Sequence, residues 1–240
     1  MKRNIKIKSW ILLVISLCLF ACSEVDNYNG PDSSFEGRII DETTGEIFVT
    51  ETGGIQIQLE ELSWSETPSP QHIPIKEDGT FEDSQLFSGH YLVMPINGPF
   101  WPLNQGIELD INGSTSHDFE VLPYLKIENL EYSLEGNTLV LNFNLKAPIS
   151  EGLPNVLDIK PFVNITNYVG NGATISQYSD PNKIDINAAW DSEMASTTYE
   201  LRVSDLKAGR KFYARVGARV DDSFKKYNYS QIVEVDVPSE

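Results

Sequence analysis

Apolar residues recur at every second position along this chain, and this period of two limits the possible folds more than any other feature. Ile55, Ile57 and Leu59 alternate with polar residues, and Leu139 and Leu141 repeat the pattern. Such alternation places one side of a β-strand in a core and the other side in water. Clusters of Gly, Asn, Pro and Asp separate these segments, as turns do. The sequence therefore predicts an all-β fold built from short strands.

The predicted strands fall into two groups. Pro123 lies between them, where it would interrupt a strand ladder because proline has no backbone N–H to donate. We therefore expect two β-sandwich domains in tandem, over residues 35–122 and 123–240. Several short strands with turn residues between them are typical of a sandwich.

Two stretches resemble known β-sandwich families. The first half resembles the carboxypeptidase regulatory-like, transthyretin-type sandwich at Gly37–Asp41, Thr44–Glu46, Ile55–Leu59, Asp78–Phe81 and Leu86–Val93. The second half resembles the fibronectin type III or Ig-like sandwich at Leu206–Ala218, where Phe212 takes the position of the usual tyrosine. Domains of the first kind generally have no catalytic activity of their own, so this resemblance implies a structural scaffold.

The first 22 residues are typical of an export signal. Basic residues come first, the apolar run Trp10–Phe20 follows, and a small residue precedes Cys22. A membrane-spanning helix needs about 20 apolar residues, and this run is shorter. Leu19–Cys22 resembles the bacterial lipobox, which implies that residues 1–21 are a signal peptide and that Cys22 carries lipid. Residues 22–34 would then form a flexible tether.

The residues after the cysteine that would carry lipid indicate where in the cell the protein is sent. Glu24 and Asp26 resemble the acidic signal that sends lipoproteins of the Bacteroidetes to the outer face of the outer membrane. We expect the protein to be anchored to this membrane through Cys22, at the cell surface, with the periplasmic face as the alternative. Cys18 lies in the segment that would be removed, so the exported chain keeps no pair of cysteines for a disulfide.

Charge and composition argue against several functions. The chain has 18 Lys and Arg against 35 Asp and Glu, a net charge of −17, whereas nucleic acid binding requires a basic surface. Its 3 histidines show no metal-ligand spacing, and no nucleotide-binding motif is present. The sequence therefore predicts no metal site, no cofactor and no enzyme. A carboxylate pair of a glycoside hydrolase cannot be singled out among so many acids, so hydrolysis is the least favoured alternative.

Aromatic residues in predicted loops are the best candidates for a binding site. Trp64, Trp101 and Trp190 could stack on sugar rings while neighbouring polar side chains bond the hydroxyls. Alternatively, these rings cap the ends of the sandwich cores, since large aromatics are mostly buried. A further aromatic group could form a binding loop or line the hairpin before the last strand: Phe224, Tyr227 and Tyr229.

The lipobox, the regulatory-like domain, the boundary at Pro123–Tyr124 and the run Tyr213–Arg219 with Tyr227–Ser230 together resemble a Bacteroidetes family catalogued as domain of unknown function 3823. The resemblance implies genes beside a TonB-dependent transporter and a SusD-like lipoprotein, and hence glycan uptake at the cell surface. Our first hypothesis is a non-catalytic surface lipoprotein that binds a polysaccharide. The alternative is an accessory subunit whose partner is the transporter or the SusD-like lipoprotein.

Overall fold

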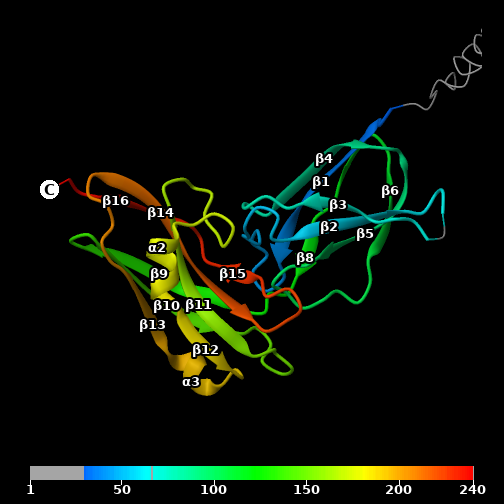
Figure 1. Cartoon of the computed structure of the whole chain (residues 1–240). Helices are drawn as coiled ribbons and strands as arrows, with labels where there is room; N and C mark the ends of the chain where they lie inside the picture. Colours follow the sequence, from blue (N-terminus) through cyan, green and yellow to red (C-terminus); the bar gives the residue numbers. More distant parts are fainter. Residues whose placement is uncertain (1–29, 66, 240) are drawn as a thin grey trace, which may run out of the picture. The chain divides into compact units, whose positions relative to one another are not determined.

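Two four-stranded sheets enclose the core of the N-terminal domain in the computed structural model, which describes residues 30–65 and 67–239 (Figure 1). In the first sheet, β1 lies between antiparallel β4 on one edge and parallel β7 and β8 on the other. The second sheet has the order β3-β2-β5-β6. The strands are β1 Ser33–Asp41, β2 Gln56–Glu61, β3 Gln71–Pro74, β4 Thr80–Leu86, β5 Gly89–Ile96, β6 Ile107–Ile111, β7 Ser114–Ser116 and β8 Phe119–Val121.

The core between these sheets is built from the apolar positions of the alternating pattern. Phe35, Phe81 and Phe119 come from the first sheet, and the ring of Phe81 lies 5.1 Å from that of Phe35 and 6.0 Å from that of Phe119. Ile57 and Val93 of the second sheet are completely buried in the same cluster. Burial of such side chains contributes roughly 1.5–3 kcal/mol each, which makes this core the main source of stability of the domain.

Gly37 allows two backbone segments to approach each other in the first sheet. A Cβ atom at this position would lie 1.8 Å from the carbonyl oxygen of His117. The backbone N–H of His117 donates to the carbonyl of Glu36 at 3.0 Å, which holds the two segments together. A residue larger than glycine therefore collides with the main chain.

The C-terminal domain has a three-stranded sheet of order β13-β10-β9 and a five-stranded sheet. In the larger sheet β12, β11, β14 and β15 follow one another, and β16 also pairs with β14 (Figure 1). The strands are β9 Lys126–Glu135, β10 Thr138–Lys146, β11 Val156–Asn164, β12 Ile184–Ala188, β13 Thr198–Val203, β14 Arg210–Val220, β15 Tyr227–Tyr229 and β16 Val233–Val237.

The five-stranded sheet is buried on both faces at its centre. Ala214 and Val216 of β14 point into the core of the C-terminal domain. On the opposite face, Phe162 of β11 packs with Tyr229 and with Val49 of the N-terminal domain. The alternating pattern predicts one wet face for such strands, and the structure differs because the N-terminal domain covers part of that face.

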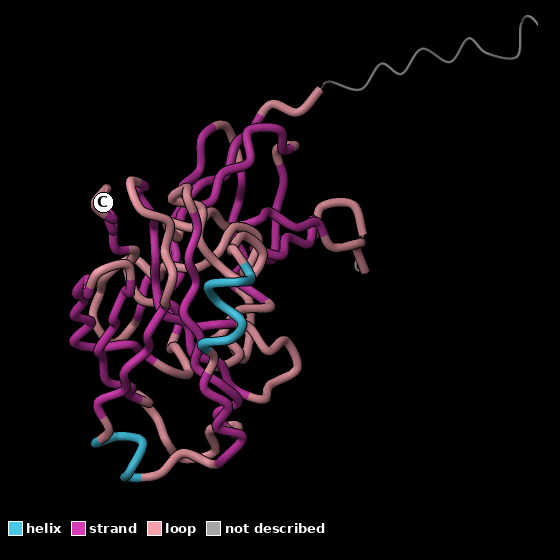
Figure 2. The backbone as a smooth tube through the Cα atoms, turned by 60° about the vertical axis from the view of Figure 1, so that its left-hand side comes forward, coloured by secondary structure: helices cyan, strands magenta, loops and turns pink. Residues whose placement is uncertain are grey.

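Short helical segments connect strands of the C-terminal domain (cyan in Figure 2). They are α2 Ser176–Ser179, the 3-10 helix η1 Asp180–Asn182 and α3 Ser192–Ser196. The side chain of Asp191 caps α3 by accepting a hydrogen bond from the Met194 N–H at 2.8 Å. Among the described residues, no helix is long and apolar enough to cross a membrane.

The predicted all-β fold with two β-sandwich domains in tandem is confirmed. The strands divide between β8 and β9, beside the boundary predicted at Pro123. Residues 31–240 form one compact unit that includes both domains. The predicted signal peptide, Cys22 and the first part of the predicted tether lie outside the described residues.

Candidate functional site

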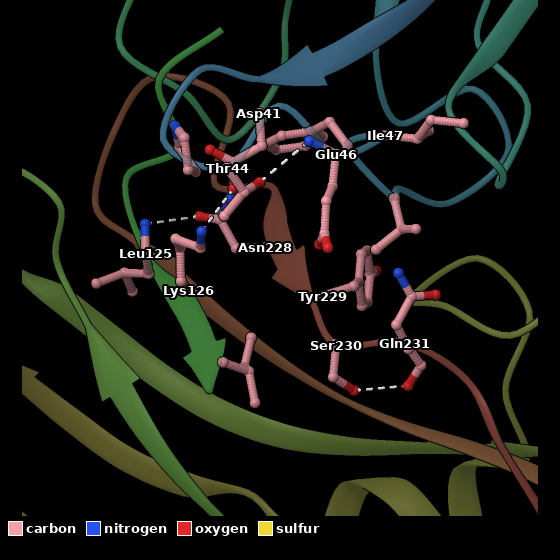
Figure 3. Close-up of a pocket in the computed structure, with 14 residues that line it drawn as sticks. Asp41, Thr44, Glu46, Ile47, Leu125, Lys126, Asn228, Tyr229, Ser230 and Gln231 are labelled. Carbon is pink, nitrogen blue, oxygen red and sulfur yellow. Dashed lines mark hydrogen bonds and ion pairs between the residues drawn. The ribbon is translucent and has the colours of Figure 1, made fainter. Parts of the chain in front are cut away.

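Asn228, in the middle of β15, connects the two domains by hydrogen bonds (Figure 3). Its Nδ2 donates to the carbonyl of Pro99 at 2.8 Å, and its Oδ1 accepts from the N–H of Leu125 at 3.1 Å. Both bonds are buried, and Phe100 forms an isolated antiparallel bridge with Pro123 beside them. The amide of Asn228 therefore fixes the position of the segment around Phe100.

An ion pair also connects the two domains at this boundary. The Lys126 Nζ lies 2.9 Å from Asp41 Oδ2 and donates to the Thr43 hydroxyl at 2.7 Å. Burial alone would raise the pKa of Asp41, but the hydrogen bonds from Thr43 and Lys126 outweigh burial and lower this pKa below its ordinary value. The Asp41 carboxyl group is therefore ionised at neutral pH, and its contact with Lys126 joins the two domains.

Arg215 lies on the outer face of the five-stranded sheet, where only 1% of its surface is exposed. Its guanidinium lies 3.7 Å above the ring of Tyr229, and its Nη1 donates to the carbonyl of Thr50 at 2.9 Å. Within the described part of the chain, its Nε and Nη2 have no hydrogen-bond partner. Burial lowers the pKa of Arg215 to about 10, although Tyr229 and Glu51 favour its charge. The N-terminal domain therefore supplies the backbone oxygen that a buried cation requires.

A cavity of about 150 Å³ lies at this boundary (Figure 3). Its polar lining is largely bound within the protein: Asp41 pairs with Lys126, and the Ser230 hydroxyl donates to the Gln231 carbonyl at 2.9 Å. Asn228 carries the two bonds given above. The cavity therefore offers few unpaired hydrogen-bonding groups to a ligand. Asp41, Lys126 and Asn228 instead hold the two domains together.

A second cavity, of about 270 Å³, lies against the outer face of the sheet that contains β2 and β5. Gln58 and Met94 are register partners on these strands and face outward, whereas Val93 is buried. Residues of both domains line the cavity: Gln58, Met94–Gly98, Phe100, Pro102, Leu103, Tyr124 and Asp222–Phe224. Sites for drug-sized ligands measure roughly 300–1,000 Å³, so this cavity suits about one sugar ring.

Phe224 is the exposed aromatic side chain of the second cavity. It lies in the turn between β14 and β15 and is 48% exposed, whereas Phe100 and Tyr124 line the cavity as buried side chains. The backbone N–H of Lys225 donates to Asp222 Oδ1 at 2.6 Å, which fixes the turn. Because this bond fixes the backbone of the turn, Phe224 can bind a flat apolar face with little loss of backbone entropy.

Polar side chains of the second cavity have hydrogen-bonding atoms to spare. Asn97 donates from Nδ2 to Gln56 Oε1 at 3.2 Å, and Gln58 donates from Nε2 to Glu60 Oε1 at 2.7 Å. Across residues 30–65 and 67–239, no protein partner is found for Asn97 Oδ1, Gln58 Oε1 or the Ser223 hydroxyl. These oxygens can accept hydrogen bonds from the hydroxyls of a ligand.

The three predicted tryptophans lie in loops but do not share a cavity. Trp64 follows β2 and is 80% exposed. Trp101 and Trp190 are partly buried and pack against the core of the C-terminal domain, and the ring of Trp101 lies 5.3 Å from that of Tyr124. None of the three lines either cavity. Of the three, Trp64 has the ring that is most accessible to a ligand, and glycan binding by these residues stays a prediction.

Tyr227 and Tyr229 belong to β15 and are buried, so they do not form a binding loop with Phe224. Their rings pack edge-on against Phe162, and the Tyr227 hydroxyl donates to Asp158 Oδ1 at 2.7 Å. Burial raises the pKa of both tyrosines. The sequence pattern alone does not reveal this burial, because the residues that pack against these rings, Phe162 of β11 and Val49 of the N-terminal domain, lie far away in the sequence.

The second cavity has few ionisable groups in its lining. Asp222 is the one carboxylate in its lining, whereas glycoside hydrolysis usually requires two carboxyl groups that flank the bond. In the part of the chain that the structure describes, no group of three or more His, Cys, Asp or Glu side chains could hold a metal ion. An exposed ring beside free oxygen acceptors can hold a ring-shaped ligand that carries hydroxyls.

Solved structures of similar proteins share this fold. A Bacteroides uniformis protein named "putative carbohydrate binding protein" is 25% identical, with a TM-score of 0.73 over 86% of this chain and 100% of that chain. A DUF3823 family protein from the same species is also 25% identical, with a TM-score of 0.77 over 87% of this chain and 100% of that chain. A DUF3823 family protein from Parabacteroides merdae is 21% identical, with a TM-score of 0.69 over 87% of this chain and 100% of that chain, which indicates a common fold.

Family comparison covers both domains. No curated protein matches the sequence. Residues 33–122 match the family described as protein of unknown function (DUF3823) N-terminal domain, and residues 125–234 match the domain of unknown function DUF3823_C. With both of its domains matched in order, the chain belongs to the DUF3823 family.

Proposed function

We propose that this protein is a non-catalytic carbohydrate-binding lipoprotein of a bacterial glycan-uptake system. The observation that carries the proposal is the cavity beside Phe224, where an exposed ring lies next to unpaired oxygen acceptors. The name of the Bacteroides uniformis relative, "putative carbohydrate binding protein", supports the same class of ligand.

In the proposed complex, Phe224 stacks on the apolar face of one sugar residue. Met94 and Leu103 supply the remaining apolar surface, and Asn97 and Gln58 accept hydrogen bonds from the hydroxyls. Sugar hydroxyls leave water at a cost of a few kcal/mol unless they are paired again, so these acceptors would decide whether binding is favourable. Trp64, whose ring is exposed, is a second contact for a longer glycan.

The proposal includes a place for the protein in the cell. Lipid on Cys22 would anchor it to the outer membrane, facing the cell surface or alternatively the periplasm. Two or three acyl chains hold a protein far more firmly than one chain does. A TonB-dependent transporter and a SusD-like lipoprotein would be its neighbours, and it would pass glycan to them without breaking a bond.

Replacing Phe224 with alanine should weaken retention on the cognate polysaccharide about tenfold or more. Burial of a phenylalanine side chain contributes roughly 1.5–3 kcal/mol, and about 1.4 kcal/mol corresponds to a factor of ten in affinity. The measurement is affinity electrophoresis of the full chain in mild detergent, in gels that contain plant, host or microbial polysaccharides.

Phe87 provides the matched control for this experiment. It is 51% exposed, close to the value for Phe224, but it lies between β4 and β5 and does not line the cavity. Phe87→Ala should leave retention unchanged. Equal retention of the Phe224→Ala variant and the unmodified protein would remove the cavity from the proposal.

An accessory role in a transporter complex has one specific observation in its favour. Ile165 and Tyr168 are both exposed in the loop that follows β11, and Asn164 holds this loop by donating to the Tyr168 carbonyl at 3.1 Å. Two apolar side chains on an ordered loop suit a protein contact. If this role applies, the protein should co-purify with the transporter after mild detergent extraction, and the Ile165→Ser, Tyr168→Ser double variant should not. If the transporter is recovered equally with the double variant and with the unmodified protein, the result would count against a contact through this loop.

A further inference from the structure

The cavity beside Phe224 has one charged side chain in its lining, and that side chain is an acid. Asp222 lines it together with the neutral polar residues Gln58, Asn97 and Ser223. No lysine or arginine of the described residues contributes to the lining. Protein sites that bind carboxylate, sulfate or phosphate groups normally provide arginine, lysine or a cluster of backbone N–H groups.

The cations nearest in sequence do not compensate this charge. Lys225 Nζ pairs with Asp221 Oδ1 at 2.9 Å, and Lys226 is partly buried and does not line the cavity. Asp222 is held in position by the Lys225 N–H. Burial and the charge of Asp222 together raise the pKa of Tyr124, whose ring forms part of the wall, so the field of this carboxylate extends into the cavity.

We infer that this cavity accepts electrically neutral sugar residues and rejects residues that carry a carboxylate or sulfate. The inference rests on the proposed function, since it names the class of glycan that the same site would bind. An anionic substituent in a cavity of this size would lie within a few ångströms of Asp222 and would lose water without gaining a cation. The net charge of −17 acts in the same direction at longer range.

The direct test compares two forms of one polysaccharide that differ only at C6, with a neutral hydroxymethyl group in one and a carboxylate in the other. The polysaccharide that the full chain retains is converted at C6, by oxidation of a neutral sugar to the uronate or by reduction of a uronate to the neutral sugar. Both forms are then measured by affinity electrophoresis at low ionic strength. We expect the neutral form to be retained at least about tenfold more strongly.

Substitutions of two acids, one inside the lining and one outside it, separate a local effect from overall charge. Asp222→Asn keeps an oxygen for the Lys225 N–H but removes the charge from the cavity, and it should reduce the preference for the neutral form severalfold. Asp83→Asn makes the same change of net charge outside the lining, keeps an oxygen for the Gln85 N–H, and should leave the preference as it is.

The outcomes distinguish this inference from the function on which it rests. If no polysaccharide is retained, the proposed function fails. Equal or stronger retention of the anionic form, lost in the Phe224→Ala variant, would overturn the selection for neutral sugars while the binding function stands. Equal effects of the Asp83 and Asp222 substitutions would likewise overturn the role given to Asp222.

Discussion

Gly37→Ala is expected to destabilise the N-terminal domain by about 3 kcal/mol or more, a large part of the stability of an ordinary domain. In a strand interior, alanine is normally better than glycine by roughly 0.5–1 kcal/mol, so the substitution would stabilise the protein if space were available. Here the new Cβ would lie 1.8 Å from the His117 carbonyl oxygen and 2.8 Å from its carbon. Both contacts are with main chain in a hydrogen-bonded ladder, which cannot rotate away. The cost of the collision therefore exceeds the gain from replacing glycine, and the substitution destabilises the domain.

Urea denaturation followed by circular dichroism measures this effect, with Gly30→Ala as the control. A Cβ at Gly30 would meet nothing within 4 Å, and its backbone does not need a positive φ. The control should unfold like the unmodified protein. A Gly37→Ala midpoint equal to that of the control would show that β1 and the segment after β7 can move apart.

Asn228→Ala should destabilise the protein by about 2–6 kcal/mol, because the carbonyl of Pro99 and the N–H of Leu125 each lose a partner in a buried place. An unpaired buried group costs about 1–3 kcal/mol, and Asn228 serves two of them. Phe100 follows Pro99 and lines the proposed sugar cavity, so retention on polysaccharide should weaken as well.

Asn144 gives the comparison for this second experiment. Its Nδ2 also bonds a backbone carbonyl, that of Thr197 at 3.1 Å, but at a partly exposed position where water can replace the lost partner. Asn144→Ala should cost about 1 kcal/mol or less. Thermal unfolding of the two variants side by side measures the difference, and equal melting temperatures would contradict the bridging role of Asn228.

The strands were predictable from the sequence because alternation is a local property. The register of β2 against β5 places Ile57 beside Pro95 and Leu59 beside Val93, and all four are buried as the pattern predicts. Burial that depends on another domain was not predictable. Arg215 occupies a polar position of an alternating strand, where the pattern predicts contact with water, yet the N-terminal domain covers it.

The candidate site was predictable only in part. The aromatic residue Phe224 is identifiable from its turn, but its cavity brings together segments around residues 58, 94–103 and 222–224, and no local pattern connects them. The loop positions of the tryptophans were also predictable. The exposure of each tryptophan was not predictable. Trp64 is exposed to solvent, whereas Trp101 and Trp190 pack against a core that residues of other strands form.

The central position of β1 also has a mechanical consequence. Tension on the preceding chain enters the domain at Ser33, the first residue of β1. That strand is bonded to β4 along one edge and to β7 and β8 along the other. A pull along β1 loads these bonds in shear, together, instead of peeling them apart one after another. A domain tethered at this end, as we propose, should therefore unfold slowly when a bound polymer pulls on it. The quantity that measures this resistance is the rate of forced unfolding.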